Sequence, residues 1–189
     1  MTKGENSRGA RQAWGGVAAH DDEEDLRLLV LMRHAKAKAT SETGDFGRPL
    51  HRDGRAAARV MGEWLVAQGV RPDIAVVSPS ARTVQTWEEL ARAGVRADDL
   101  WADAAIYDGE ASDLVESVRA LPDDARVVAL IGHLPGIPHL AARLADHLPA
   151  GHQHPDEGWP PASVAVVAHR GSWEAFPNSD SAVVAFRRG

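Results

Sequence analysis

The chain of 189 residues contains no cysteine. This absence excludes disulfide bonds, zinc sites built on thiolates and catalysis by a cysteine nucleophile. The sequence also lacks any run close to the roughly 20 apolar residues that a helix needs to cross a bilayer. Residues 1–25 show no charged-then-apolar signal pattern. We therefore expect a cytoplasmic protein that does not associate with a membrane.

Positive charge is in the minority, with 21 Lys and Arg residues against 27 Asp and Glu residues and a formal net charge of -6. Nucleic-acid binding depends largely on Lys and Arg side chains that neutralise phosphates, so this balance disfavours a nucleic-acid partner. With 44% hydrophobic residues, the chain can bury a substantial core. We predict one folded domain over residues 26–189, preceded by a disordered acidic tail over residues 1–25.

Short apolar runs alternate with amphipathic stretches along this predicted domain. The runs have strand length and are continuous, which is typical of strands buried on both faces of a largely parallel sheet. They cover residues 28–32, 74–77, 127–131, 164–167 and 182–186. Four stretches with helical spacing lie among them. Their apolar positions are Ala57, Val60, Met61, Trp64 and Leu65; Val84, Trp87 and Ala91; Leu114, Val115, Val118 and Leu121; and Ile137, Leu140, Ala141, Leu144 and Leu148.

This alternation predicts an α/β fold, a three-layer α/β/α sandwich with a mostly parallel central sheet of about five strands. Each of the first three strands ends in polar residues. Arg33 and His34 follow the first strand, a segment that leads to Arg82 follows the second, and His133 comes soon after the third. In open α/β sheets ligands bind beyond the carboxyl ends of the strands, so we expect these side chains to converge.

Two arginines and two histidines at one site suit a phosphoryl group, because guanidinium donors match phosphate oxygens in bidentate geometry and stay charged. The sequence contains neither a glycine-rich Walker loop nor the carboxylate cluster typical of magnesium phosphoryl-transfer sites. We therefore predict no metal ion and no other cofactor. A neutral histidine that attacks phosphorus, with arginines that neutralise the equatorial oxygens, fits these residues.

Several segments of the chain resemble the histidine phosphatase superfamily, also called phosphoglycerate mutase-like. The resemblance covers residues 28–188, and in detail it is closest to the small SixA-type phosphohistidine phosphatase branch. The segments that carry it are Arg33-His34-Ala35-Lys36-Ala37, Arg48-Pro49-Leu50, Ser78-Pro79-Ser80-Ala81-Arg82-Thr83, Ile106-Tyr107 and Val128-Ala129-Leu130-Ile131-Gly132-His133-Leu134-Pro135-Gly136.

The resemblance implies that His34 is the phosphorylated nucleophile, that Arg33 and Arg82 bind the phosphate, and that His133 is the second histidine of the site. It also places Thr40 near a phosphate-contacting position of many relatives. The implied fold is that of phosphoglycerate mutase. The implied function is a metal-independent phosphatase that acts through phosphohistidine on His34, with a phosphorylated protein as substrate and inorganic phosphate as product.

Many members of the superfamily use a carboxylic acid to protonate the leaving oxygen, and Asp108 and Glu110 are the nearest candidates here. An imidazole leaving group is a far weaker base than an alkoxide, so a phosphohistidine substrate needs less help from a general acid. In two positions the chain departs from the common family pattern. Ala35 stands where glycine is usual, and Leu134 stands where asparagine commonly follows the second histidine.

Three other interpretations remain open at this point. A small-molecule phosphomonoesterase would use the same phosphate-binding residues. A phosphate-binding or scaffold protein without catalysis is the second, to which Leu134 lends some support. A metal site formed by His147, His152, His154 and Asp156 is the third, although their Gly- and Pro-rich surroundings are more typical of a solvated loop.

Overall fold

The computed structural model describes residues 25–145 and 158–189. Residues 1–24, which make up nearly all of the predicted tail, lie outside the described residues. The histidines and the aspartate of the alternative metal site fall within residues 146–157, which also lie outside them. In the part of the chain that is described, no helix is both long enough and apolar enough to cross a membrane.

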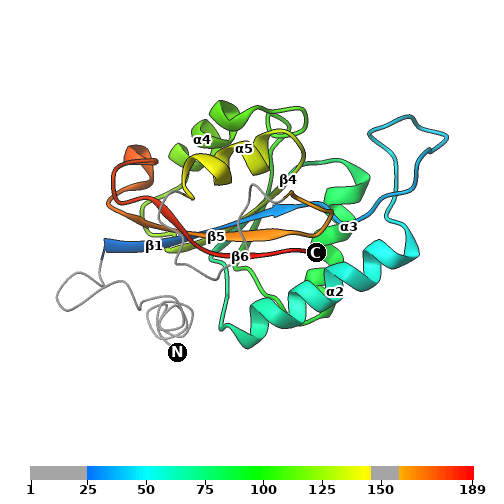
Figure 1. The fold of residues 1–189 in the computed structure, drawn as a ribbon, viewed down its shortest axis with the longest axis horizontal. Coiled ribbons are helices and arrows are strands. Elements are labelled where there is room, and N and C mark those ends of the chain that lie inside the picture. The colour runs from blue at the N-terminus through cyan, green and yellow to red at the C-terminus, as the bar shows by residue number, and fades with distance from the viewer. Residues whose placement is uncertain (1–24, 146–157) are drawn as a thin grey trace.

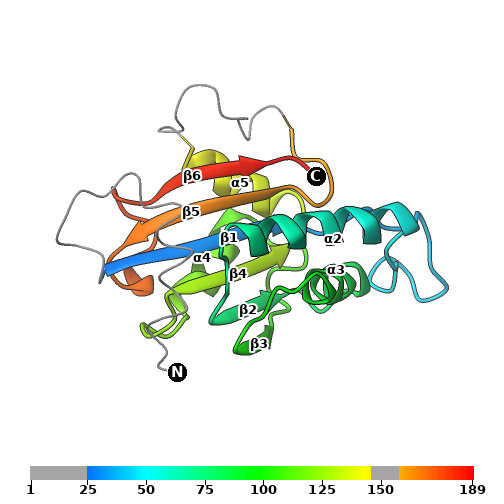
Figure 2. The ribbon, with the colours of Figure 1, turned by 90° about the horizontal axis from the view of Figure 1, so that it is seen from below.

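A six-stranded sheet with the order β3-β2-β4-β1-β5-β6 crosses the centre of the fold (Figures 1 and 2). Strands β3, β2, β4 and β1 are mutually parallel, β5 runs antiparallel to β1, and β6 runs antiparallel to β5. The prediction of a mostly parallel sheet is therefore confirmed. The strands are β1 (Leu26–Arg33), β2 (Ile74–Val77), β3 (Asp99–Ala102), β4 (Val127–Gly132), β5 (Val164–Arg170) and β6 (Ala182–Arg187).

Helices cover both faces of this sheet, as Figure 1 shows. Helices α4 (Ala111–Arg119) and α5 (Gly136–Arg143) cover one face, and α2 (Arg52–Ala67) and α3 (Ala81–Arg92) cover the other. A short 3-10 helix, η4 (Trp173–Ala175), precedes β6. Successive side chains of β1 alternate between the two cores, with Leu29 beside α4 and α5 and Leu28 beside α2 and α3. The three predicted layers are confirmed.

Two details of the prediction were wrong. Strand β3 was not expected, because all four of its residues are exposed and it lies at the edge of the sheet, where no apolar pattern is required. One inward position of α2 and the inward face of α3 were also misplaced, since Val60 on α2 and Val84 on α3 are exposed. The other predicted positions of α2 do face the core, where Met61 and Leu65 are buried. Helix α3 turns Thr83, Thr86 and Glu89 inward instead, and hydrophobic spacing cannot indicate a buried polar face.

Glu89 joins α2 to α3 through charge. Its side chain is 1% exposed and receives hydrogen bonds from Arg55 at 3.0 Å, Arg59 at 2.5 Å and Arg92 at 2.5 Å. Burial acts to raise the pKa of Glu89, but hydrogen bonds from Arg59 and Arg55 outweigh that effect and lower the pKa below its ordinary value. Glu89 is therefore a buried carboxylate that stays ionised and paired near neutral pH.

We expect Glu89→Gln to lower the free energy of unfolding by about 3 kcal/mol, the lower end of the range for breaking a buried ion pair, because the partly exposed arginines can regain water. Urea titration measures this change. Glu88→Gln is the matched control, because Glu88 lies on the same helix, is 47% exposed and has one contact of 3.8 Å with Arg92. An equal decrease in the free energy of unfolding in the two variants would contradict the assignment of Glu89 as a buried, paired carboxylate.

Candidate active site

The carboxyl ends of β1, β2 and β4 meet at one edge of the sheet, because β4 lies between the other two. The last residues of β1 and β4, Arg33 and Gly132, are paired in register. The histidines that follow them therefore meet, and the ring centroids of His34 and His133 are 5.1 Å apart. Strand β2 also pairs with β4, and it leads into α3, whose second residue is Arg82.

Hydrogen bonds fix both the backbone and the ring of His34. Its backbone N–H donates to the carbonyl of Gly132 at 3.0 Å, and its carbonyl accepts from the N–H of Ala162 at 3.2 Å. The ring Nδ1 lies 2.8 Å from the carbonyl oxygen of Ala35. A carbonyl only accepts, so Nδ1 carries the proton and donates it. The neutral ring then has its lone pair on Nε2, the nitrogen that can act as a nucleophile.

The charge state of His34 suits a nucleophile. Burial, together with the positive charges of Arg82, Arg33 and Arg48, lowers the pKa of His34 to about 4, although the hydrogen bond to Ala35 opposes this shift. Because the folded-state value lies below the ordinary value of about 6.5, the ring is neutral throughout the physiological range. Burial therefore keeps His34 unprotonated, and the same positive charges that favour an anion at this site add to that effect.

We expect the ring of His34 to remain neutral as the Nδ1–H tautomer well below pH 6, and to gain its second proton only as the pH falls through about 4. Long-range proton–nitrogen NMR spectra report both the tautomer and the titration. The resonance is assigned by its loss in His34→Asn. An Nε2–H tautomer, or a midpoint near 6.5, would show that the environment of His34 differs from the one described.

Arg33 and Arg82 each keep one buried donor without a partner among the described residues, namely the Nε–H group. Nη1 of Arg33 donates to the carbonyl of Trp159 at 2.5 Å. The terminal nitrogens of Arg82 donate to Asp45, Nη1 to its carbonyl at 2.8 Å and Nη2 to Oδ2 at 3.1 Å. A buried donor without a partner is costly, and an anion beside the two guanidinium groups would satisfy both.

His133 lies against the start of α3. Its Nε2 is 2.9 Å from the hydroxyl of Ser78 and 3.5 Å from the hydroxyl of Ser80, whereas Nδ1 is buried without a partner in the described part of the chain. Burial is the main reason that the pKa of His133 is lowered to about 3, and the neighbouring His34 ring, which cannot easily be protonated at the same time, and the charge of Arg82 contribute. The ring is therefore neutral at physiological pH, and one of its nitrogens remains available to an incoming ligand.

Two threonines of α3 hold the site together. The backbone N–H of Ala35 donates to Oγ1 of Thr86 at 3.0 Å, and that hydroxyl donates to the carbonyl of Arg82 at 2.6 Å. Oγ1 of Thr83 donates to the carbonyl of Ser78 at 2.7 Å. The segment after His34 is thereby tied to the helix turn that carries Arg82. Neither threonine was predicted from the sequence, although Thr86 stands four positions after Arg82 and thus lies on the same helix face.

The weaker candidates make no hydrogen bond with this cluster in the part of the chain that is described. Thr40 and Asp108 are exposed. Glu110 is the N-cap of α4, where its side chain accepts a hydrogen bond from the backbone of Asp113 in a capping box, and Oε2 also lies 3.6 Å from Nδ1 of His139. No hydrogen bond or ion pair joins these three side chains to His34 or His133 among the described residues.

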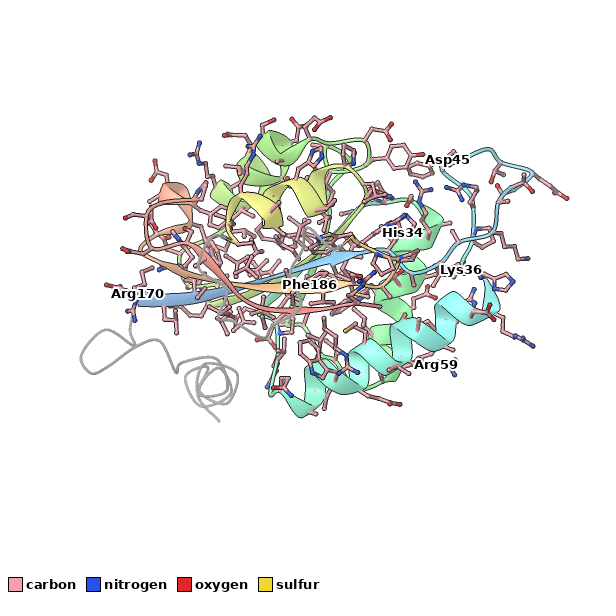
Figure 3. The ribbon with its side chains drawn as sticks, in the orientation of Figure 1. His34, Lys36, Asp45, Arg59, Arg170 and Phe186 are labelled. Atoms are coloured by element: carbon pink, nitrogen blue, oxygen red, sulfur yellow. The ribbon has the colours of Figure 1, made fainter. Side chains whose placement is uncertain are left out.

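Asp45 is the neighbour of the site that sequence analysis missed. It lies in the loop between β1 and α2, at the same end of the sheet as His34, whereas Arg170 lies at the opposite end (Figure 3). Besides Arg82, its carboxylate accepts hydrogen bonds from the hydroxyl of Tyr107 at 2.5 Å and from Nε of Arg48 at 2.7 Å. Only the three-dimensional structure reveals this pair, because Asp45 and Arg82 are 37 positions apart in the sequence.

A buried histidine that follows an arginine at the end of the first strand, with a second histidine beside it and a second arginine at the start of α3, is the arrangement expected of a histidine phosphatase. The family model of the histidine phosphatase superfamily (branch 1) matches residues 29–176, and the chain belongs to that superfamily. It is thus a hydrolase of this superfamily, and the resemblance inferred from the sequence is confirmed at that level. No curated protein is similar enough in sequence to match the chain.

Several solved structures are similar to this one. A protein assigned as phosphohistidine phosphatase SixA from Nakamurella multipartitia is 28% identical, with a TM-score of 0.73 over 86% of this chain and 96% of that chain. The protein histidine phosphatase SixA in complex with tungstate is 27% identical, with a TM-score of 0.63 over 74% of this chain and 86% of that chain. A protein assigned as SixA from Agrobacterium tumefaciens, at 22% identity and a TM-score of 0.68 over 86% and 98%, shares the fold.

Proposed function

We propose that the chain is a metal-independent phosphatase that forms a phosphohistidine intermediate on His34, and that its substrate is a phosphohistidine in a protein. The observation that carries the proposal is the hydrogen bond from Nδ1 of His34 to the carbonyl of Ala35, which leaves a lone pair on Nε2. Arg33, Arg82 and His133 each have a buried side-chain nitrogen without a partner among the described residues, and such nitrogens suit phosphoryl oxygens.

In the first step, Nε2 of His34 attacks phosphorus, a P–N bond forms to His34, and the P–N bond of the substrate breaks. The leaving imidazole takes up a proton from solvent. Because Nδ1 keeps its proton, the phosphorylated ring is cationic, and the carbonyl of Ala35 stabilises that charge. In the second step water attacks phosphorus, the P–N bond to His34 breaks, and inorganic phosphate and one proton are released as the neutral ring is restored.

The carboxylates near the site favour a leaving group that needs little acid catalysis. Asp45 is the carboxylate whose charge reaches His133. Hydrogen bonds from Tyr107 and Arg48 lower the pKa of Asp45 far below its ordinary range, so this group is ionised and cannot supply a proton near neutral pH. Glu110 is engaged in capping α4. A nitrogen leaving group, a weaker base than an alkoxide, suits such a site.

The comparisons support the proposal without deciding the substrate. The neighbours at 27% and 28% identity are both described as SixA proteins, and one of them binds tungstate, an oxyanion similar in shape to phosphate. A small phosphate ester would use the same phosphate-binding residues, so the leaving group is what distinguishes the two substrate classes.

We expect a phosphohistidine peptide to be hydrolysed with a higher kcat/KM than either an aryl phosphate or a set of sugar phosphates. The rates should be unchanged in EDTA, because arginine and histidine supply the positive charge. Release of inorganic phosphate measures all three substrates in one assay. A higher kcat/KM for the sugar phosphates than for the phosphohistidine peptide would overturn the substrate assignment. Activity that is lost in EDTA and restored by magnesium would overturn the mechanism.

A further inference from the structure

We propose that Asp45 is a positioning residue for Arg82, which holds the end of the guanidinium group so that its Nε side remains available to a phosphoryl group. The inference rests on the proposed function, because it assigns a role at the same site. It concerns a residue outside the segments through which the chain resembles its family.

The donors of Arg82 are divided between two edges of the guanidinium plane. The terminal nitrogens bind the backbone carbonyl and the carboxylate of Asp45, at 2.8 and 3.1 Å. Nε is buried without a partner among the described residues. A guanidinium group is a rigid fork, and its Nε edge can by itself bind an oxyanion through two parallel hydrogen bonds. Asp45 therefore orients the fork and leaves that second edge unused.

Asp45 is itself held in place from three directions. Oδ1 accepts from Arg48 at 2.7 Å, and Oδ2 accepts from the hydroxyl of Tyr107 at 2.5 Å. The carbonyl of the next residue, Phe46, accepts from the N–H of Ala81 at 3.0 Å, which fixes the loop to the first residue of α3. Because these donors restrain the carboxylate, Asp45 can hold the guanidinium group of Arg82 in one orientation, although the side chain of Asp45 is 57% exposed.

Tyr107 completes the arrangement around Arg82. Its ring centroid lies 5.4 Å from Cζ of Arg82 and 5.2 Å from the ring centroid of His133. The guanidinium group is thus held by an aromatic ring as well as by an ionised carboxylate. Among the described residues Arg33 has no comparable support, since Nη1 donates to a neutral backbone carbonyl. Of the two arginines, Arg82 is therefore the one whose orientation depends on a charged partner.

A double-mutant cycle tests this role, with Asp45→Ala, Arg82→Ala and the combined variant. The probes are tungstate, whose binding is measured by calorimetry, and an aryl phosphate, for which kcat and KM are measured separately. We expect Asp45→Ala to weaken tungstate binding about tenfold and to lower kcat by about 10²-fold, the scale on which small misplacements act. In the Arg82→Ala background, Asp45→Ala should cause no further decrease in tungstate affinity or in kcat.

Glu42→Ala is the matched control, because Glu42 is an exposed acid in the same loop and its removal changes the net charge equally. This variant should retain wild-type binding and turnover. Tighter tungstate binding in Asp45→Ala would overturn the proposal and make Asp45 a competing anion. The proposal would also be overturned if Asp45→Ala reduced tungstate affinity and kcat equally in the wild-type and the Arg82→Ala backgrounds. If the wild-type protein hydrolyses no phosphate compound, the proposed function fails, but the tungstate cycle still decides the role of Asp45.

Discussion

His34→Asn abolishes turnover and the phosphorylated enzyme if His34 is the nucleophile, with an expected loss of about 10⁴-fold or more, as for other covalent nucleophiles. Asparagine removes the ring nitrogen that attacks phosphorus, but its amide can still donate to the carbonyl that receives Nδ1–H of His34. The fold should therefore persist. Rapid quenching of the wild-type enzyme in alkali traps an acid-labile phosphoenzyme, and peptide mapping locates the label.

Two further variants sharpen this test. His139→Ala is the control, because His139 is an exposed histidine on α5, and it should keep both label and turnover. His133→Ala should retain some label, because that ring is assigned to the support of the transferring group. Label on His133 in the wild-type enzyme, or substantial turnover in His34→Asn, would refute the assignment of the nucleophile while leaving the fold intact.

Arg82→Ala should lower kcat by about 10²–10³-fold, the usual cost of one lost donor to a transition state. The side chain is 6% exposed, and its ionic partner is a carboxylate that water can reach. Truncation therefore leaves no buried unpaired charge, and we expect the free energy of unfolding to change by about 1 kcal/mol or less. Steady-state kinetics and urea titration on the same preparations measure the two effects.

Arg52→Ala provides the matched control for this prediction. The side chain of Arg52 is 94% exposed at the start of α2, and its loss should alter neither rate nor stability measurably. Arg82→Lys should recover little activity, because an ammonium group cannot reproduce the bidentate edge of a guanidinium. A near-normal rate in Arg82→Ala together with a large loss of stability would assign Arg82 a structural role.

Much of the fold could be predicted because strands that are buried on both faces have a distinctive, continuously apolar sequence. Strands β1, β2 and β4 are covered by helices on both sides, so their residues form uninterrupted apolar runs. Strand β3 could not be found in this way, since it is an exposed strand at the edge of the sheet, where it pairs with β2. The inward face of α3 was missed for the converse reason. Its buried Thr83, Thr86 and Glu89 are polar, and partners from other elements satisfy them.

The candidate site was predictable where its residues follow strands and not where they lie in loops. His34 and His133 come directly after β1 and β4, and parallel strands bring their carboxyl ends to one edge. Asp45 sits in a polar loop whose composition indicates only turns. Its contact with Arg82 depends on how that loop docks against α3, which no local pattern encodes. The tautomer of His34 likewise depends on the position of a single backbone carbonyl.

The position of β4 in the sheet has a consequence for the order of folding. This strand lies between β1 and β2 but follows both in the chain, so Leu28 pairs with Val127 across about a hundred residues. Such distant pairing carries a large loop-closure cost and forms slowly compared with helices and hairpins. In a nascent chain that has not yet reached β4, strand β1, which precedes His34, and strand β2, which leads into α3 and Arg82, share no neighbouring strand. The candidate active site therefore forms only when β4, the last of the parallel strands in the chain, is inserted between β1 and β2. Recovery of catalytic activity during refolding measures that insertion step.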